Sequence, residues 1–470
     1  MKKTGILCKI FCLTLSILLL SMPVMAVDVA DYDLPVTQGC HSIDAQVPMI
    51  GASKDIENVQ SAFLYDYDTQ TLVYSVNPDT MCDPGSLVKI MTGFIVAEQG
   101  NLDDIVTVSG EILDLLPEGS YVLDLQDGEK ISLRDLLYCI LVDSANDAAI
   151  IAANHISGSV EAFVQEMNRY ATEFGCSNTT FTNVHGIYDP FQTTTARDIA
   201  KILVMATENE AFMDAFSSVY YTVPATNKSD ERELATNNFL MNDDMMSIYL
   251  DERVTGGRAA TMESGERNLA VTAEQDDVRL VSVVIGSESV LAEDGYSTVT
   301  FGSFTETSAL LNLGFKGHYS CQIFYENQIL KQFEVQNGDS YLTVGIKDPV
   351  RALLPSGVTY SDLSYRFDDS ATQIQAPVKA GEKITTVQVW YNDLCLAVTD
   401  LFAMHDVSVK TYVPAEEIPE ETATGVPSAV IIIFSIILLL VVLLFGRRFI
   451  FRIIRKRRIK NSKRIRRRNR

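Results

Sequence analysis

The sequence predicts an α+β protein. We expect an antiparallel sheet packed with helices, then a small all-β domain and one transmembrane helix near the C-terminus. Strand patterns occur both before and after a long helical region, which favours one sheet built from both ends of that region. Short alternating stretches separated by turn residues follow, and then a long apolar run. At 470 residues the chain is long enough for two domains.

The first 26 residues have the pattern of a secretory signal peptide. Three lysines come first, an apolar stretch runs from residue 10 to residue 20, and small residues lead up to Ala26. This order predicts export and cleavage near Ala26. An uncleaved anchor helix is the alternative.

Residues 27–314 are predicted to form the first folded domain. Residues 61–66 and 72–75 have the pattern of a strand hairpin. Apolar spacing then predicts helices, and two late strands close the domain. The predicted helices cover residues 86–99, 133–155, 159–175 and 195–207, and the late strands cover residues 269–273 and 280–285.

Residues 315–412 are predicted to form a small β domain, because alternating stretches are separated there by turn signals such as 337–339, 355–357 and 380–382. Residues 413–428 follow as an acidic stalk. This segment contains four glutamates and three prolines and is too polar to pack as a core.

Residues 429–446 are apolar enough for a transmembrane helix. The tail at 447–470 contains 14 basic residues and no acidic one, which favours a cytoplasmic C-terminus. We therefore expect a single-pass protein of the cell membrane with its folded part outside. That exported part has 21 basic and 61 acidic residues, a formal charge of −40, which excludes a nucleic-acid-binding role.

Six cysteines remain beyond the signal peptide. No two of them form a Cys-x-x-Cys pair, so we expect neither a metal site nor a cofactor. Disulfides are compatible with export, and Cys321 with Cys395 is the first pair to test, although buried free thiols are equally compatible. The six are Cys40, Cys82, Cys139, Cys176, Cys321 and Cys395.

A serine and a lysine three residues apart open the first predicted helix. Ser86 and Lys89 share one face of it, and the serine lies near its positive end. A lysine among apolar neighbours loses its proton readily and can act as a base toward a serine hydroxyl. The pattern alone is common and also fits an ordinary N-capped surface helix.

Two further elements follow along the chain. Ser144 and Asn146 form a Ser-x-Asn sequence after an apolar helical stretch, where the hydroxyl would relay a proton and the amide would hold a substrate carbonyl. A polar helix cap is the alternative. Thr255, Gly256 and Gly257 precede the two late strands, where a strand edge would take the substrate.

These three elements, in this order, resemble those of the penicillin-binding and active-site serine β-lactamase superfamily. Residues 181–190 and 195–198 are similar to the segment after Ser-x-Asn in the low-molecular-mass D-Ala-D-Ala carboxypeptidases. Residues 309–315 are similar to the domain junction of that family, and 374–383 to its C-terminal β domain. The likeness covers about residues 55–410, and this colinearity is more specific than any single motif.

The resemblance implies a serine D-Ala-D-Ala carboxypeptidase that acts on peptidoglycan stem peptides and binds β-lactam antibiotics. Ser86 would be the nucleophile, Lys89 its base and Ser144 the relay of the proton to the leaving amine. His185 would be structural rather than a base. The implied substrate-binding residues are Asn146, Thr255, Gly256 and Gly257, with the backbone N–H groups of Ser86 and Gly257 as the oxyanion hole.

One position departs from the family's third motif. The family has Lys-Thr-Gly, whereas this chain has Val254 before Thr255, and the missing ammonium normally polarises the site. On a regular strand, Arg253 points to the opposite face, and Arg258 lies about 13 Å further along. Two alternatives stay open: an active enzyme with positive charge from Arg253, Arg258 or elsewhere, or a weakened homologue that binds cell wall. A β-lactamase is less favoured, because residues 178–190 offer no glutamate for deacylation.

Overall fold

The structure is a computed structural model. It describes residues 40–411 except 52, 263–264, 292–297 and 369–372, together with 432–433, 435–437 and 439. The predicted signal peptide, basic tail and nearly all of the predicted stalk and transmembrane span lie outside the described residues. Within the described part, no helix is both long and apolar enough to cross a membrane. The chain divides into two units, Met1–Val409 and Lys410–Arg470, and the elements named below all belong to the first.

Five antiparallel strands form the main sheet, in the order β2-β1-β9-β8-β7. The early strand β1 pairs with the late strand β9, with Phe63 opposite Val283. The prediction of one sheet built from both ends of a helical region is therefore confirmed, and β7 lies at one edge of that sheet. The strands are β1 Ser61–Asp66, β2 Thr71–Val76, β7 Val254–Thr261, β8 Arg267–Gln275 and β9 Val278–Ser287.

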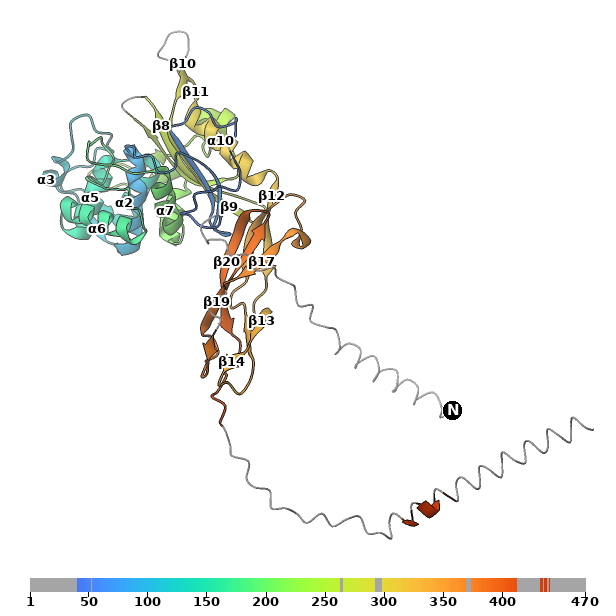
Figure 1. Cartoon of the computed structure of the whole chain (residues 1–470). Coiled ribbons are helices and arrows are strands. Elements are labelled where there is room, and N and C mark those ends of the chain that lie inside the picture. Colours follow the sequence, from blue (N-terminus) through green and yellow to red (C-terminus); the bar gives the residue numbers. More distant parts are fainter. Residues whose placement is uncertain are drawn as a thin grey trace, which may run out of the picture. The chain divides into compact units, whose positions relative to one another are not determined.

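Helices cover both faces of this sheet (Figure 1). Side chains alternate along β1, so that Phe63 and Tyr65 pack against the helical region between β2 and β7. Ala62 and Leu64 pack on the other face, against the helix α10, Gly302–Phe315. The helical region contains η1 Gly85–Leu87, α2 Val88–Gln99, α3 Gly110–Leu113, α4 Leu133–Tyr138, η2 Cys139–Asp143, α5 Asn146–Ser157, α6 Val160–Glu173, α7 Ala196–Ala206, α8 Glu210–Phe216, α9 Asp243–Met246 and η3 Ser247–Tyr249.

Three short hairpins complete this domain. Their strands are β3 Ile105–Thr107 with β4 Lys130–Ser132, β5 Tyr220–Val223 with β6 Arg232–Ala235, and β10 Ser289–Leu291 with β11 Thr298–Phe301.

One predicted helix is interrupted. Apolar spacing over residues 133–155 predicts a single helix, but the chain forms α4, then the π-helical turn η2, and only then α5. Ser144 lies in the break with φ 71°, in the left-handed region that few non-glycine residues adopt. Periodicity does not reveal this break, because the apolar residues on both sides of it face the same core.

The second domain is a small β domain, as predicted. Its main sheet has the order β13-β15-β20-β19-β17, and it has a core of its own. The strands are β12 His318–Phe324, β13 Ile329–Phe333, β14 Val335–Gln336, β15 Leu342–Gly345, β16 Val350–Pro355, β17 Ser364–Phe367, β18 Ile374–Gln375, β19 Lys383–Tyr391 and β20 Leu394–Ala403, with the single turn η4 Tyr360–Asp362.

The six described cysteines are free thiols. The pair proposed for a first test, Cys321 with Cys395, is therefore not bridged. Instead, Cys321 Sγ lies 3.3 Å from the hydroxyl of Tyr360. Cys395 lies next to Cys40, and the Sγ of Cys40 donates to the Cys395 carbonyl oxygen at 3.3 Å.

Candidate active site

The predicted nucleophile lies in a tight turn that opens helix α2. Gly85 has φ +52°, and its N–H donates to Asp83 Oδ1 at 3.0 Å. The 3₁₀ turn η1 then carries Ser86 into α2. Ser86 is half-buried and lies at the positive end of the helix, where the free backbone N–H groups favour developing negative charge.

Lys89 is fully buried one turn after Ser86. Its Nζ donates to Asn146 Oδ1 at 2.6 Å and to the backbone carbonyl oxygen of His185. Burial lowers the pKa of Lys89 well below its usual value, the positive charge of Arg258 lowers it further, and Asp147 acts in the opposite direction. The site therefore favours an uncharged lysine, the form that can accept a proton.

The Ser-x-Asn sequence lies in the break between η2 and α5. Ser144 follows the π-helical turn and is nearly buried, with its N–H donating to the Cys139 carbonyl. Two residues later, Asn146 opens α5; its N–H donates to the Tyr121 carbonyl at 3.0 Å, and its amide oxygen accepts from Lys89. The structure thus brings Lys89 and Asn146 together, and Ser144 lies two residues before Asn146 in the break between η2 and α5.

His185 does not have the properties of a catalytic base. Its Nδ1 accepts a hydrogen bond from the N–H of Ile187 at 3.1 Å. Burial and the neighbouring Lys89 lower the pKa of His185 to about 4. The residue contributes its backbone carbonyl to Lys89, which agrees with the structural role expected for it.

Thr255, Gly256 and Gly257 serve the packing of β7. Thr255 Oγ1 donates to Thr272 Oγ1 at 2.9 Å. A Cβ on Gly256 would lie 2.5 Å from the ring of Phe216, and a Cβ on Gly257 would overlap the side chain of Asn238. None of these contacts involves the nucleophile turn.

A later part of β7 meets that turn instead. A Cβ placed on Gly85 would lie 2.8 Å from Met262 Sδ and 3.4 Å from Ala260 Cβ. At about 3.4 Å per residue, Thr255 is roughly 17 Å before Ala260, and Gly257 roughly 10 Å before it. The substrate-binding role expected of Thr255, Gly256 and Gly257 therefore stays a prediction, and the β7 residue packed against the nucleophile turn is Ala260.

Arg258 is the cation that β7 brings to the site. It is fully buried, and its Nη1 donates to the carbonyl oxygens of Leu141 and Val142 at 3.0 and 3.3 Å. Arg258, one of the expected sources of positive charge, therefore acts on Lys89, although along a regular strand it lies about 13 Å beyond Val254. Arg253 is held elsewhere, by Asp251 and Asn312. The side-chain parity of Arg258 was the only sequence signal for this position.

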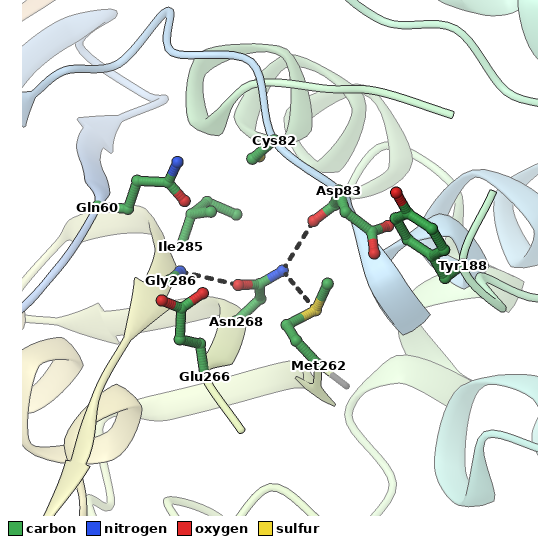
Figure 2. A pocket seen from close by; sticks show the side chains of 9 residues that line it. All are labelled: Gln60, Cys82, Asp83, Tyr188, Met262, Glu266, Asn268, Ile285 and Gly286. Atoms are coloured by element: carbon green, nitrogen blue, oxygen red, sulfur yellow. Dashed lines mark hydrogen bonds between the residues drawn. The ribbon is translucent and has the colours of Figure 1, made fainter. Parts of the chain in front are cut away.

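A cavity of about 330 Å³ lies beside the nucleophile turn. Asn268 lies on its wall and links the turn to the sheet: its Nδ2 donates to the Asp83 carbonyl at 3.2 Å and contacts Met262 Sδ at 3.3 Å, while its Oδ1 accepts from the Gly286 N–H (Figure 2). The cavity is lined by Gln60, Cys82, Asp83, Tyr188, Met262, Glu266, Asn268, Ile285 and Gly286.

A serine at a helix N-terminus beside a buried lysine that favours its uncharged form, next to an edge strand, is an arrangement typical of a serine acyl-transfer enzyme. The chain belongs to the D-alanyl-D-alanine carboxypeptidase family, whose model matches residues 49–289. A second model, that of the C-terminal domain of penicillin-binding protein 5, matches residues 320–409. The family expected from the motifs is therefore confirmed.

Similar proteins cover most of the chain. The D-alanyl-D-alanine carboxypeptidase DacC of Escherichia coli is 29% identical over 73% of this chain and 83% of its own length. DacA of Haemophilus influenzae, also named a D-alanyl-D-alanine carboxypeptidase, is 28% identical over 79% of this chain and 91% of its own. The solved structure of penicillin-binding protein 5 from H. influenzae matches with a TM-score of 0.65 at 28% identity, over 76% of this chain and all of that one.

Proposed function

We propose that this chain is a penicillin-sensitive serine D-Ala-D-Ala carboxypeptidase that removes the terminal D-alanine from peptidoglycan stem pentapeptides. The observation that carries this proposal is the state of Lys89. It is fully buried, its hydrogen-bond acceptors among the described residues are neutral, and it lies one turn from Ser86 in a chain of this family. An amine in that environment is a base at neutral pH.

Acylation begins when the Ser86 hydroxyl oxygen attacks the carbonyl carbon between the two D-alanines. Lys89 takes the hydroxyl proton as the new C–O bond forms. The C–N bond then breaks, and Ser144 passes a proton to the departing amine of D-alanine. Asn146 holds Lys89 and positions the substrate backbone. Water subsequently hydrolyses the ester on Ser86 and releases the shortened peptide.

The oxyanion hole needs one N–H from the nucleophile turn and one from β7. Ser86 supplies the first. The Met262 N–H donates to the Glu266 carbonyl at 2.8 Å, toward the β7–β8 turn. Since N–H groups alternate between the two edges of a strand, the Thr261 N–H points to the free edge of β7. We therefore propose Thr261 in place of Gly257 as the second donor.

The weakened cell-wall-binding homologue becomes less favoured. That alternative depended on Val254 in place of a lysine, and hence on a site without a second cation. Arg258 supplies such a cation at the place where β7 passes Lys89. A β-lactamase stays less favoured as well, because residues 178–190 contain no glutamate for deacylation.

The chain's ends suggest where this activity takes place. We propose the domain plan expected from the sequence: signal peptide 1–26, catalytic domain 27–314, β domain 315–412, stalk 413–428, transmembrane helix 429–446 and cytoplasmic tail 447–470. Protease added to intact spheroplasts should then degrade the folded domains and spare the basic tail. Protection of the folded domains would rule out this orientation.

The activity is tested with the full-length chain in detergent, incubated with a fluorescent penicillin and, separately, with an acyl-D-Ala-D-Ala peptide. We expect labelling and release of D-alanine. Ser86→Ala should abolish both, whereas Ser356→Ala, an exposed serine of the β domain, should leave both unchanged.

The two readouts separate the alternatives. Ser86-dependent labelling without release of D-alanine would favour the weakened homologue. If neither labelling nor release occurs with the folded native chain, the enzymatic proposal is wrong.

A further inference from the structure

Two sulfur atoms lie on the wall of the cavity beside the nucleophile turn. They belong to Cys82 and Met262, and both side chains are partly exposed. The cavity measures about 330 Å³, which is room for several water-sized molecules and hence for a small oxidant such as hydrogen peroxide. An oxidant can therefore reach sulfur next to the turn that carries Ser86.

The two sulfur atoms differ in their reactivity toward a peroxide. A cysteine reacts as its thiolate, and burial raises the pKa of Cys82 to about 12, so that this thiol stays protonated at neutral pH. Its Sγ also donates to the Thr194 carbonyl oxygen at 3.4 Å. The thioether of Met262 has no proton to lose before it reacts. Met262 is therefore the more readily oxidised of the two residues.

Met262 packs directly against the nucleophile turn. A Cβ placed on Gly85 would lie 2.8 Å from Met262 Sδ, so the space between the thioether and the turn is already filled. Met262 also follows Thr261, the second N–H donor proposed for the oxyanion hole. Its backbone is fixed by the carbonyl of Glu266 at 2.8 Å and the N–H of Gly265 at 3.0 Å. A chemical change at this sulfur therefore acts close to both donors of the oxyanion hole.

Asn268 connects the thioether to the same turn (Figure 2). Its Nδ2 contacts Met262 Sδ at 3.3 Å, and it donates to the carbonyl oxygens of Asp83 and Pro84 at 3.2 and 3.4 Å. A thioether sulfur is only a weak acceptor, whereas oxidation to the sulfoxide makes the side chain polar. A sulfoxide oxygen on Met262 would compete for Asn268 Nδ2 with the two carbonyls that precede Gly85.

We propose that Met262 is an oxidation site, and that its conversion to the sulfoxide by a peroxide slows the acylation of Ser86. With hydrogen peroxide, one oxygen atom forms a bond to Sδ, the O–O bond breaks, and the other oxygen leaves as water with both protons. The thioether loses two electrons and the peroxide gains them. The added oxygen pushes Met262 away from Gly85 and draws Asn268 from the turn. This inference rests on the proposed function, because it concerns the acylation of Ser86.

The experiment treats the full-length chain in detergent with hydrogen peroxide at neutral pH and removes the excess with catalase. The rate of acylation by a fluorescent penicillin is then measured, and mass spectrometry of peptides gives the fraction of Met262 that carries one added oxygen. The rate should fall in proportion to that fraction, by roughly tenfold or more at full conversion, since loss of one oxyanion donor costs about 100- to 1,000-fold. Methionine sulfoxide reductases for both epimers should restore it.

Three variants identify the sensitive sulfur. Met262→Leu keeps the volume and apolar character of the side chain and has no sulfur, so it should be acylated at close to the native rate before and after peroxide. Met81→Leu is the matched control, because Met81 is 57% exposed and lies five residues before Ser86. Both Met81→Leu and Cys82→Ala should lose their acylation rate as the native chain does.

Two results would overturn the proposal. One is a native chain that keeps its acylation rate when Met262 is fully converted, and this result needs no variant, so it decides the question even if Met262→Leu does not fold. The other is protection by Met81→Leu or Cys82→Ala but not by Met262→Leu. A native chain that is not labelled before peroxide is added would instead mean that the proposed function has failed.

Discussion

Lys89 and Asp66 are both fully buried, and each shows how burial decides the ionisation of a single residue. The N–H groups of Lys89 have two acceptors, and burial lowers its pKa and so favours its neutral form, which can accept a proton. Asp66 lies at the end of β1. Its Oδ1 accepts from the N–H groups of Asp68 and Thr69 at 3.0 and 3.2 Å, while its Oδ2 has no partner. Burial raises the pKa of Asp66 to about 6.

The raised pKa of Asp66 predicts a loss of stability with rising pH. In the unfolded chain the Asp66 carboxyl group has a pKa near 4 and releases its proton around that pH. In the folded chain it keeps the proton to a higher pH. The contribution of Asp66 to stability is therefore greatest below about pH 4 and falls until the folded-state pKa near 6 is passed. The loss amounts to roughly 3 kcal/mol for two pKa units.

Asp66→Asn should remove this part of the pH dependence, because the amide oxygen still accepts the two N–H groups and the side chain does not ionise. Urea unfolding at several values between pH 4 and pH 8 measures the effect. The exposed Asp114→Asn is the control and should unfold with the native pH dependence. If the free energy of unfolding changes equally with pH in the native chain and in Asp66→Asn, Asp66 is not the source of the pH dependence.

At the scale of single elements, the loop of residues 181–194 holds the nucleophile turn in place. Its Gly186 has φ +84°, and a Cβ there would overlap the Gly85 carbonyl and lie 2.9 Å from the Ser86 nitrogen. On the same loop, His185 accepts from Lys89. The loop and the turn are therefore packed backbone to backbone, so that a single methyl group is enough to separate them.

Gly186→Ala should disturb the site more than the fold. We expect a cost of roughly 1–3 kcal/mol from the left-handed backbone and a loss of about 100-fold in the rate of acylation, as the Ser86 N–H leaves its position. Thermal unfolding and penicillin labelling measure the two effects.

The matched control is Gly158→Ala at the end of α5. Gly158 has φ +78° and no atom within 4 Å of an added Cβ. It shares the cost of the left-handed backbone but not the overlap, so it should lose less stability than Gly186→Ala and keep native acylation. Native acylation in Gly186→Ala would mean that the turn does not depend on the loop.

At the scale of the whole molecule, two cores meet at strand β16. Leu353 is fully buried among residues of the first domain, with Ile56, Leu310 and Leu311. The next residue, Leu354, is fully buried in the core of the β domain. Adjacent side chains of one strand thus belong to different cores, and β16 joins the two domains.

Leu353→Ala should uncouple the unfolding of the two domains. The cavity is expected to cost roughly 2–5 kcal/mol, most of it at the junction. Scanning calorimetry should then resolve two transitions, and bound penicillin should raise only that of the first domain.

Leu354→Ala, a deletion of the same size one residue later, should lower the stability of the β domain and leave the contacts of Leu353 intact. If both variants behave alike, β16 does not couple the domains.

Much of this architecture was accessible from the sequence, because its signals are local. Ser86 and Lys89 are one helical turn apart, so their proximity follows from helix geometry alone. The strand patterns on both sides of a helical region predicted the sheet, and turn residues predicted the β domain. The order of the motifs along the chain identified the family.

Other features required the tertiary structure, because they depend on how distant segments pack. The left-handed Ser144 results from a π-helical turn whose apolar residues look like ordinary helix. The approach of β7 to the nucleophile turn joins residues far apart in the sequence, since a Cβ on Gly85 would lie 3.4 Å from Ala260 Cβ.

Arg258 depends on both kinds of information. The face of the strand on which Arg258 lies could be predicted from the alternation of side chains, but its burial beside Lys89 could not. The sequence by itself determined the class of fold and predicted the nucleophile and its base, since each signal is encoded within a few residues. Only the folded chain decided which cation acts on the base, because a charge exerts its effect through distance and burial, and both are properties of packing.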